Sequence, residues 1–554
     1  MVNKGDSNTP DYSAGFRRAL YAGAGFSPEK LKKPLVGVLN TWGEISPATR
    51  RIKEICREVR EGVLEAGGTP VEFCLSGLCD GTCAGTPGAS NYNMVWREVA
   101  SAYIECVATA NQFDALVMVA VCDESVPACL IAAARLDIPA VIVSGGSMRP
   151  GKYRAQDLCL SDPTAAFLRL KRGEINLEDY QAIESRCLPG AGACGVMGTG
   201  ITMQVFSEVV GIILSGTSVM PGDGPEILAA ARSAGRQIMK LQASGLTAGK
   251  IITKSSIENG IRAVMACGGS TCAIFHIMAL AAEIGEELSL EDFQRLGEST
   301  PLLGDILPGG RHPVERFNLS GGAPGLLKEL APMLHQGCPT VSGLTIGEIC
   351  AAFPGFSDPV IRKLDSPLAP TGGIGILYGS LAPEGAVSKP HSVAPQLKHH
   401  RGPAKPYDSE KDLCEAIMAG ELEPGDVAIV RYAGPRGGPG MPCLYSSMWL
   451  LRGFGLDESV ALVSDGRVSG TIKGAVVAHV APEAADGGPI ALVEKGDLVE
   501  IDLDEGRIDL LVPEELLAAR AADWAPYRPE TKGFLEFYRQ HVQSTQKGAY
   551  LGGR

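Results

Sequence analysis

The sequence predicts an α/β protein in which an N-terminal α/β domain, built on a parallel sheet, precedes a smaller, mostly β, barrel-like C-terminal domain. Strand and helix signals alternate over the first two thirds of the chain, and this alternation favours a parallel sheet covered by helices. Ala115–Val121 is entirely apolar, which is typical of a central parallel strand. Later in the chain short strand signals dominate, so we expect domains over 1–380 and 411–554 joined by a linker over 381–410.

The N-terminal elements follow from local patterns of apolar residues. Such residues recur at helical spacing over 51–66, and Gly67-Gly68 supplies a stop signal for that helix. The remaining expected elements are strands at 34–40, 71–75 and 140–144 and helices at 94–110, 126–136, 201–214 and 272–284.

The C-terminal part of the chain shows mostly short strand signals and few helix signals. Residues 381–410 hold five prolines and little apolar periodicity, which indicates a linker. Asp504-Glu505-Gly506 reads as the turn of a hairpin into a strand at 507–512. The remaining expected elements are strands at 426–432, 460–464, 475–480, 490–493 and 498–503 and a helix at 513–521.

Composition excludes several classes of protein. Of 554 residues 45% are apolar, and 50 basic against 63 acidic residues leave a net charge of −13. The chain is too apolar to be disordered, and its acidic balance argues against a nucleic-acid partner. We find no apolar stretch of about 18 residues and no secretory signal, so we expect a cytoplasmic protein without a membrane partner. Most of its 16 cysteines should then be buried thiols.

Cys122-Asp123-Glu124 is the most informative candidate site. It directly follows the strand expected at 115–121, and ligands of α/β sheets bind beyond the carboxyl ends of strands. One thiol and two carboxylates offer one soft and two hard metal ligands. The alternative is structural: Cys122 is a buried thiol and Asp123 caps the following helix.

Two further segments carry cysteines. Gly190–Gly195 matches G-x-G-x-x-G, but no strand precedes it, so we reject a dinucleotide site there. Cys194 in that loop stands at the start of a helix, a favourable place for a thiolate ligand. We interpret the Cys74, Cys79 and Cys83 group as structural, because it has no partner pair.

The loops at 434–441 and 464–470 are rich in glycine, which allows a ligand to approach the backbone closely. Ser469 in the second loop has neither a nearby His nor a G-x-S-x-G elbow, so an ordinary serine hydrolase is unsupported. Without further information Ser469 reads as a turn residue. The eight histidines form no H-x-x-x-H pair, which argues against a His-based zinc site.

Taken together, these segments resemble the dihydroxy-acid and sugar-acid dehydratases (the IlvD/Edd family), in the family's order and over nearly the whole chain. The matching motifs are Asn40-Thr-Trp42, Asp80-Gly81, Cys122-Asp123, Ser144–Met148, the Cys187–Gly195 loop, Gly268–Thr271, Gly434–Met441, Asp465–Gly470 and His479–Ala485.

The resemblance implies a hydro-lyase that dehydrates a 2,3-dihydroxy carboxylate to a 2-keto-3-deoxy acid. It implies two cofactors, an iron–sulfur cluster (2Fe-2S rather than 4Fe-4S) as Lewis acid and Mg²⁺ to hold the substrate. It also implies a small anionic hydroxy-acid substrate and a homodimer or homotetramer. The matching positions are Cys122 and Cys194 for the cluster, Asp80, Asp123 and Glu124 for Mg²⁺, Ser469 for the base, and Ser144, Gly145 and Arg467 for the substrate.

The chain departs from the family pattern at three positions. Ala48 stands where many members carry a Cys, and Glu124 stands where a carbamylated Lys is usual. Ala433 stands where branched-chain dehydratases carry a metal-ligating Glu, and with Trp42 it favours a sugar acid as substrate. A branched-chain dihydroxy-acid dehydratase is the first alternative. The second is a paralogue without a cluster, which binds a hydroxy acid or runs metal-only lyase or isomerase chemistry.

Overall fold

The structure is a computed structural model that describes residues 12–84, 86, 88–355, 358–468 and 474–552. Its N-terminal part is built on a four-stranded parallel sheet. The strand order is β2 (Thr69–Cys74), β1 (Leu35–Asn40), β3 (Ala115–Ala120) and β4 (Ala140–Ser144). Every residue of β1, β3 and β4 is buried, as a parallel sheet covered on both faces requires. The predicted parallel α/β domain is confirmed.

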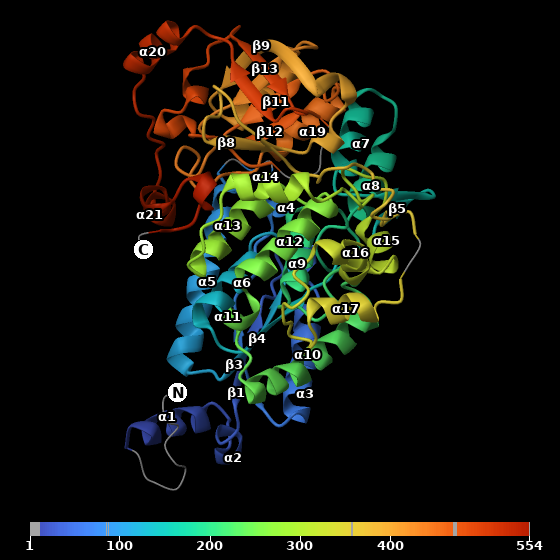
Figure 1. The fold of residues 1–554 in the computed structure, drawn as a ribbon, viewed down its shortest axis with the longest axis vertical. Coiled ribbons are helices and arrows are strands. Elements are labelled where there is room, and N and C mark those ends of the chain that lie inside the picture. Colours follow the sequence, from blue (N-terminus) through green and yellow to red (C-terminus); the bar gives the residue numbers. More distant parts are fainter. Residues whose placement is uncertain (1–11, 85, 87, 356–357, 469–473, 553–554) are drawn as a thin grey trace.

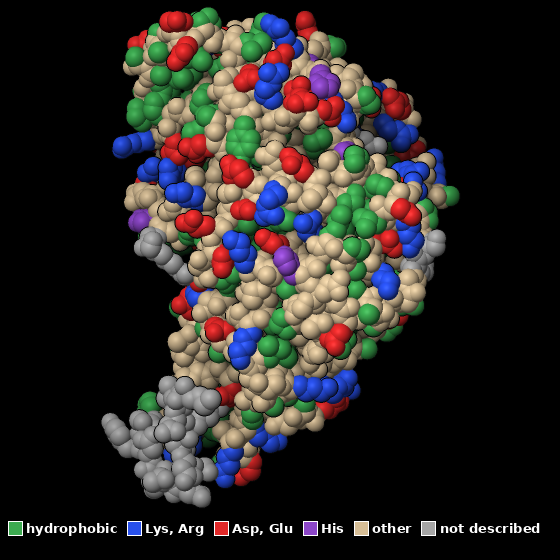
Figure 2. Space-filling model, in the orientation of Figure 1, with side chains coloured by type: hydrophobic (Ala, Val, Ile, Leu, Met, Phe, Trp, Pro, Cys, Tyr) green, Lys and Arg blue, Asp and Glu red, His purple; other side chains and the backbone are tan. Residues whose placement is uncertain are grey.

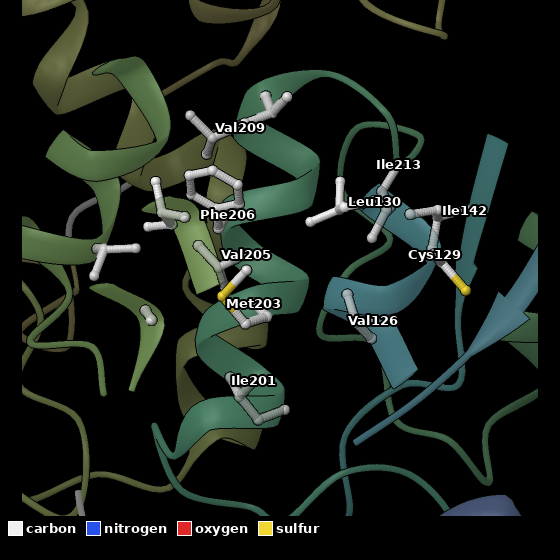
Figure 3. Packing of buried hydrophobic residues seen from close by; sticks show 14 of the residues in the cluster. Val126, Cys129, Leu130, Ile142, Ile201, Met203, Val205, Phe206, Val209 and Ile213 are labelled. Carbon is white, nitrogen blue, oxygen red and sulfur yellow. The ribbon is translucent and has the colours of Figure 1, made fainter. Parts of the chain in front are cut away.

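Helices on this sheet hold its strands in place. α3 (Ile52–Glu65) and α10 (Pro225–Ser244) pack against each other and on β3, while α6 (Ser125–Leu136) contacts β3 and β4. α9 (Thr199–Val210) is buried along its whole length. Figure 3 shows its apolar side chains packed between α6 and a further layer of helices, with the N-terminal ends of α6 and α9 on the same side. Burial on this scale fixes both helix starts relative to the sheet.

The other elements of the N-terminal part complete this helical body. They are α1 (Tyr12–Gly23), α2 (Pro28–Leu31), α4 (Asp80–Cys83), α5 (Asn91–Asn111), a hairpin of β5 (Gly151–Tyr153) and β6 (Gln156–Leu158), α7 (Asp162–Lys171), α8 (Leu177–Arg186), α11 (Ala248–Ile251), α12 (Lys254–Ala266), α13 (Ala273–Glu283), α14 (Leu290–Glu298), α15 (Val314–Leu319), α16 (Gly322–Leu330) and α17 (Ile346–Ala352).

The C-terminal part is an eight-stranded, barrel-like sheet, as the sequence predicts. Its order is β14 (Arg507–Leu510), β13 (Leu498–Asp502), β9 (His399–Tyr407), β10 (Val427–Val430), β11 (Ala461–Ser464), β12 (Val476–Ala481), β8 (Gly385–Ser388) and β7 (Gly375–Leu377). Tyr378 joins the two edges: its N–H donates to the Gly506 carbonyl, and its carbonyl accepts from the Ile508 N–H, both at 2.9 Å. The sheet is therefore nearly closed.

Two expectations for this part are wrong. Residues 381–410 are not a linker, because β8 and β9 lie within them and pair inside the barrel. The segment expected as a strand at 490–493 is a 3-10 turn, Pro489–Leu492, which begins at a proline. We recognised no sequence signal for two helices of this part, α18 (Glu410–Ala419) and α19 (Tyr445–Gly453). Parallel pairing of β9, β10 and β11 requires such crossovers.

The barrel stands at one end of the molecule, and α1 and α2 stand at the other (Figure 1). After α20 (Glu514–Asp523) and α21 (Gly533–His541) the chain returns to the helical body. There Arg97 of α5 donates to the carbonyls of Gly548 and Ala549.

Acidic and basic side chains are interspersed over the face seen in Figure 2. Within the described ranges, no helix has the length and apolarity needed to cross a bilayer.

Candidate functional site

The site is built around the turn that follows β3. Cys122 there has a φ of +76°, a left-handed conformation that costs a non-glycine residue about 1–2 kcal/mol. α6 begins three residues later, with Glu124 at its N-cap position and no side-chain cap. Asp123 is therefore not the cap that the structural alternative required. The turn instead places three consecutive functional side chains beyond the strand's carboxyl end.

Three thiols meet at this turn. The Cys122 thiol donates a hydrogen bond to Cys79, and this bond lowers the pKa of Cys79 to about 6 and raises that of Cys122. Cys194 lies close enough for the charge of Cys79 to raise its pKa further, beyond the effect of its burial. Cys187 is elsewhere, donating to the Cys159 carbonyl at 2.7 Å within a separate apolar cluster. Sequence reasoning thus missed Cys79, although its position next to Asp80 was a usable signal.

Three carboxylates adjoin the thiols. Asp80 is in the first turn of α4 and is buried. Burial raises the pKa of Asp123 to about 7, an effect that the charge of Asp80 increases. Burial likewise raises the pKa of Glu124 to about 8. The start of α9 packs onto this group, because a Cβ on Gly200 would lie 2.9 Å from Oδ1 of Asp123.

Glu124 is the carboxylate of this group that lacks hydrogen bonds. It is only 2% exposed, yet neither carboxylate oxygen has a hydrogen-bond partner. The nearest charged atom is Nη1 of Arg467, 3.4 Å from Oε1. Burial holds the pKa of His276 well below its usual value, so its Nε2, 3.7 Å from Oε2, belongs to a neutral ring. A buried carboxylate without hydrogen bonds is costly and suits a position that binds a cation.

The barrel contributes Arg467 to the site. Its Nη2 donates to Oδ1 of Asp80 at 2.9 Å, its Nη1 bonds to Oδ2 of the same carboxylate, and its Nε donates to the Met441 carbonyl at 2.6 Å. Arg467 therefore connects the carboxylates to the glycine-rich loop at 434–441. The residues expected for substrate and for metal meet here, across the two parts of the chain.

Ser144 and Gly145 are placed differently. The Ser144 hydroxyl donates to the Ser218 carbonyl at 2.7 Å and accepts from the Gly146 N–H at 2.9 Å. A Cβ on Gly145 would lie 2.7 Å from the Cβ of Val121, so this glycine faces packed core. Their expected contact with substrate stays a prediction. Ser469, expected as the base, lies outside the described residues.

The thiols and carboxylates of the site are the types of ligand that the two expected cofactors, an iron–sulfur cluster and Mg²⁺, require. Thiolates are the usual ligands of iron–sulfur clusters, and carboxylates are those of Mg²⁺. Within the described ranges, no three such side chains already gather around one point as ligands of a single ion. Neither cofactor requires that arrangement, because a cluster spreads its ligands over several irons and Mg²⁺ keeps several waters.

A separate pocket of about 670 Å³ lies in the N-terminal part. Arg149, Glu315 and Phe353 are among its lining residues, and none of the thiols or carboxylates above takes part. The chemistry of the chain is therefore not concentrated at this pocket.

Comparison with known proteins agrees with the geometry. Residues 33–349 match the N-terminal model of the dihydroxy-acid/6-phosphogluconate dehydratases, and residues 359–549 match the C-terminal model. The chain belongs to this dehydratase family. Dehydratases of this family are hydro-lyases, so the expected enzyme class is confirmed.

The relatives align with nearly the whole chain. A dihydroxy-acid dehydratase of Pyrococcus abyssi is 40% identical over 551 residues, covering 99% of this chain and 98% of the relative. Those of Ignicoccus hospitalis and Lachnospira eligens are each 41% identical, over 546 and 537 residues. The alignments cover 98% and 96%, respectively, of both this chain and the relative. These names agree with the alternative substrate class rather than with a sugar acid.

Proposed function

We propose that this dehydratase removes water from a short 2,3-dihydroxy carboxylate and forms the 2-keto acid. The observation that carries the proposal is the meeting of thiols, carboxylates and Arg467 in one buried site. The reaction balances without an oxidant: C2 loses its proton, the C3–O bond breaks, and the hydroxyl leaves as water. The resulting enol then takes a proton at C3 to become the ketone.

Cys122 and Cys194 would hold the iron–sulfur cluster, with 2Fe-2S as the proposed type. Bound there, the cluster supplies a Lewis acid for the oxygen that leaves C3. The strained turn at Cys122 and the buried helix start at Gly200 keep the thiol and Asp123 in fixed positions. Such fixed supports are what a ligand set needs to keep its geometry during turnover.

Asp80, Asp123 and Glu124 would hold Mg²⁺, which supplies positive charge for the substrate's carboxylate and C2 oxygen. The unbonded oxygens of Glu124 support this assignment, and a carboxylate there needs no carbamate. Asp80 is held by Arg467, whose charge also favours an anionic substrate nearby.

Ser469 is the proposed base that takes the C2 proton. An ordinary serine is a poor base, so neighbouring cations have to lower its pKa. Ser469→Ala should abolish turnover while iron content and visible absorbance stay at wild-type levels. Full activity in that variant would remove Ser469 from the mechanism.

The substrate class is tested by 2-keto acid formation. Protein reconstituted without oxygen, with iron, sulfide and Mg²⁺, is offered 2,3-dihydroxy-3-methylbutanoate and, separately, gluconate. We expect a higher kcat/KM for the branched acid. A protein that holds no iron yet turns over a hydroxy acid would instead be the paralogue without a cluster.

A sugar acid is the second candidate, and Ala433 is the observation in its favour. The residue is buried, its N–H donates to Asp465 at 2.9 Å, and no carboxylate extends from this position. A site without that carboxylate leaves room for a longer polyol chain. A higher kcat/KM for gluconate would select this candidate.

We also propose that the protein is cytoplasmic and that it forms a homodimer or homotetramer. All 16 cysteines lie in the described part of the chain and all are free thiols, as in a cytoplasmic protein. Phe16 and Leu20 of α1 are 73% and 61% exposed, and a dimer or tetramer would cover such side chains. Light scattering after size exclusion tests the assembly.

A further inference from the structure

Cys79 occupies a position that the proposed cluster assignment does not use. It directly precedes α4, is partly exposed, packs against the main apolar core and interacts with the thiol of Cys122. Cys74 and Cys83, its neighbours in the sequence, have other surroundings. Cys74 is exposed, and the Cys83 thiol donates to the side chain of Asn93 at 3.6 Å.

The segment that leads into Cys79 lies beside the turn that carries Ala48, because a Cβ on Gly77 would lie 3.3 Å from Cγ2 of Thr49. The Ser46 side chain, which accepts from the Ala48 N–H at 3.1 Å, contacts the Cys79 thiol as well. The Ala48 carbonyl accepts from the Gly192 N–H at 3.2 Å, which ties this turn to the loop of Cys194. Cys79 therefore reaches the space between Ala48, Cys122 and Cys194 from a different segment of the chain.

We propose that Cys79 is the third thiolate ligand of the iron–sulfur cluster and supplies the sulfur that Ala48 lacks. This inference rests on the proposed function for the presence of a cluster. Clusters are commonly held by four thiolates, so two leave the cluster weakly held. Three thiolates hold it more firmly and still leave one position for the substrate oxygen. To hold the cluster, Cys79, Cys122 and Cys194 would each release a thiol proton to solvent, and the hydrogen bond between Cys79 and Cys122 would be lost.

The test measures cofactor content rather than turnover. Wild type, Cys79→Ala and Cys79→Ser are reconstituted without oxygen, and iron, sulfide and the visible spectrum are recorded for each chain. Cys74→Ala and Cys83→Ala are the matched controls, and circular dichroism confirms folding. Loss of a residue that only supports a ligand lowers metal affinity about 10–100-fold, so loss of a ligand should cost at least that.

We expect Cys79→Ala to lose iron and sulfide while both controls keep them. Cys79→Ser preserves the shape of the side chain, so a purely structural role predicts an unchanged spectrum. Ligation predicts a shifted spectrum or a lost cluster. Wild-type iron content with an unchanged spectrum in both Cys79 variants would overturn the inference.

The proposed function can fail separately. A wild type that holds a cluster needing Cys79, but dehydrates neither acid, leaves the ligand assignment standing and removes the function. A wild type that binds no iron after reconstitution overturns the ligand assignment and the cluster-dependent mechanism together.

Discussion

Arg467 and Asp80 form an ion pair in which two guanidinium nitrogens bond to the two carboxylate oxygens, and each side chain is only 1% exposed. Arg467 follows β11 of the barrel, whereas Asp80 begins α4 of the N-terminal part. The pair therefore joins the two parts of the chain at the proposed active site.

Removing the guanidinium group of Arg467 should destabilise the fold. Arg467→Met leaves the Asp80 carboxylate buried without its partner, and breaking a buried pair in this way costs about 3–5 kcal/mol. Urea unfolding of the metal-free protein measures the loss. Arg436→Met is the control, because Arg436 and Asp486 are 39% and 30% exposed, and such pairs contribute about 0–1 kcal/mol. Equal losses in the two variants would contradict the prediction.

Gly200 should tolerate no side chain. The Cβ of Gly200→Ala would lie 2.9 Å from Oδ1 of Asp123 and 3.2 Å from the Cα of Cys122, so one of them must move. We expect kcat/KM to fall about tenfold or more, with a stability loss of about 1–3 kcal/mol. Gly198→Ala is the control, because a Cβ there meets nothing within 4 Å. The idea fails if both variants retain wild-type activity.

Glu124 should govern the affinity for Mg²⁺. Glu124→Gln keeps the size of the side chain but loses the negative charge, so half-saturation should require about tenfold more Mg²⁺ or more. Titration of activity with Mg²⁺, supported by calorimetry, measures the change. Glu208→Gln controls for removal of a buried carboxylate, because Glu208 bonds to the N–H groups of Gly216 and Ser218 instead. An unchanged half-saturation would exclude Glu124 as a ligand.

Glu483 should make stability depend on pH. Burial raises its pKa from 4.5 to about 8, so between these values the folded state binds a proton that the unfolded state has released. Stability from this group is therefore full below about pH 4.5 and falls as pH rises to about 8, by at most about 1.4 kcal/mol per pH unit. Unfolding experiments should show a flatter profile for Glu483→Gln than for wild type. Parallel profiles would assign the slope to other groups.

Much of the fold follows from local pattern. The apolar run at Ala115–Val121 became the buried strand β3, and the turn Asp504-Glu505-Gly506 joins β13 to β14, with Asp502 opposite Arg507. Such elements are predictable because side-chain periodicity and turn chemistry act over a few residues. Prolines misled the prediction at 381–410, because β9 accommodates two of them within a paired strand.

The candidate site was only partly predictable. Cys122, Asp123 and Glu124 could be chosen because they follow a recognisable strand. Cys79 was overlooked because it shares one short segment with Cys74 and Cys83, although its position next to Asp80 set it apart. Their difference arises from the orientation of the chain after β2, which turns Cys79 alone toward Cys122.

The sequence alone was enough to establish the family, the α/β and barrel-like parts and the residue types of the site, because these depend on order along the chain. The partners of those residues depend on packing. Arg467 reaches Asp80 across 387 positions only because the barrel closes onto the ends of the parallel strands. That closure leaves Glu124 buried without hydrogen bonds and brings a third thiol beside Cys122. Local sequence patterns do not predict such contacts, because the contacts form only when distant segments bury their apolar faces together.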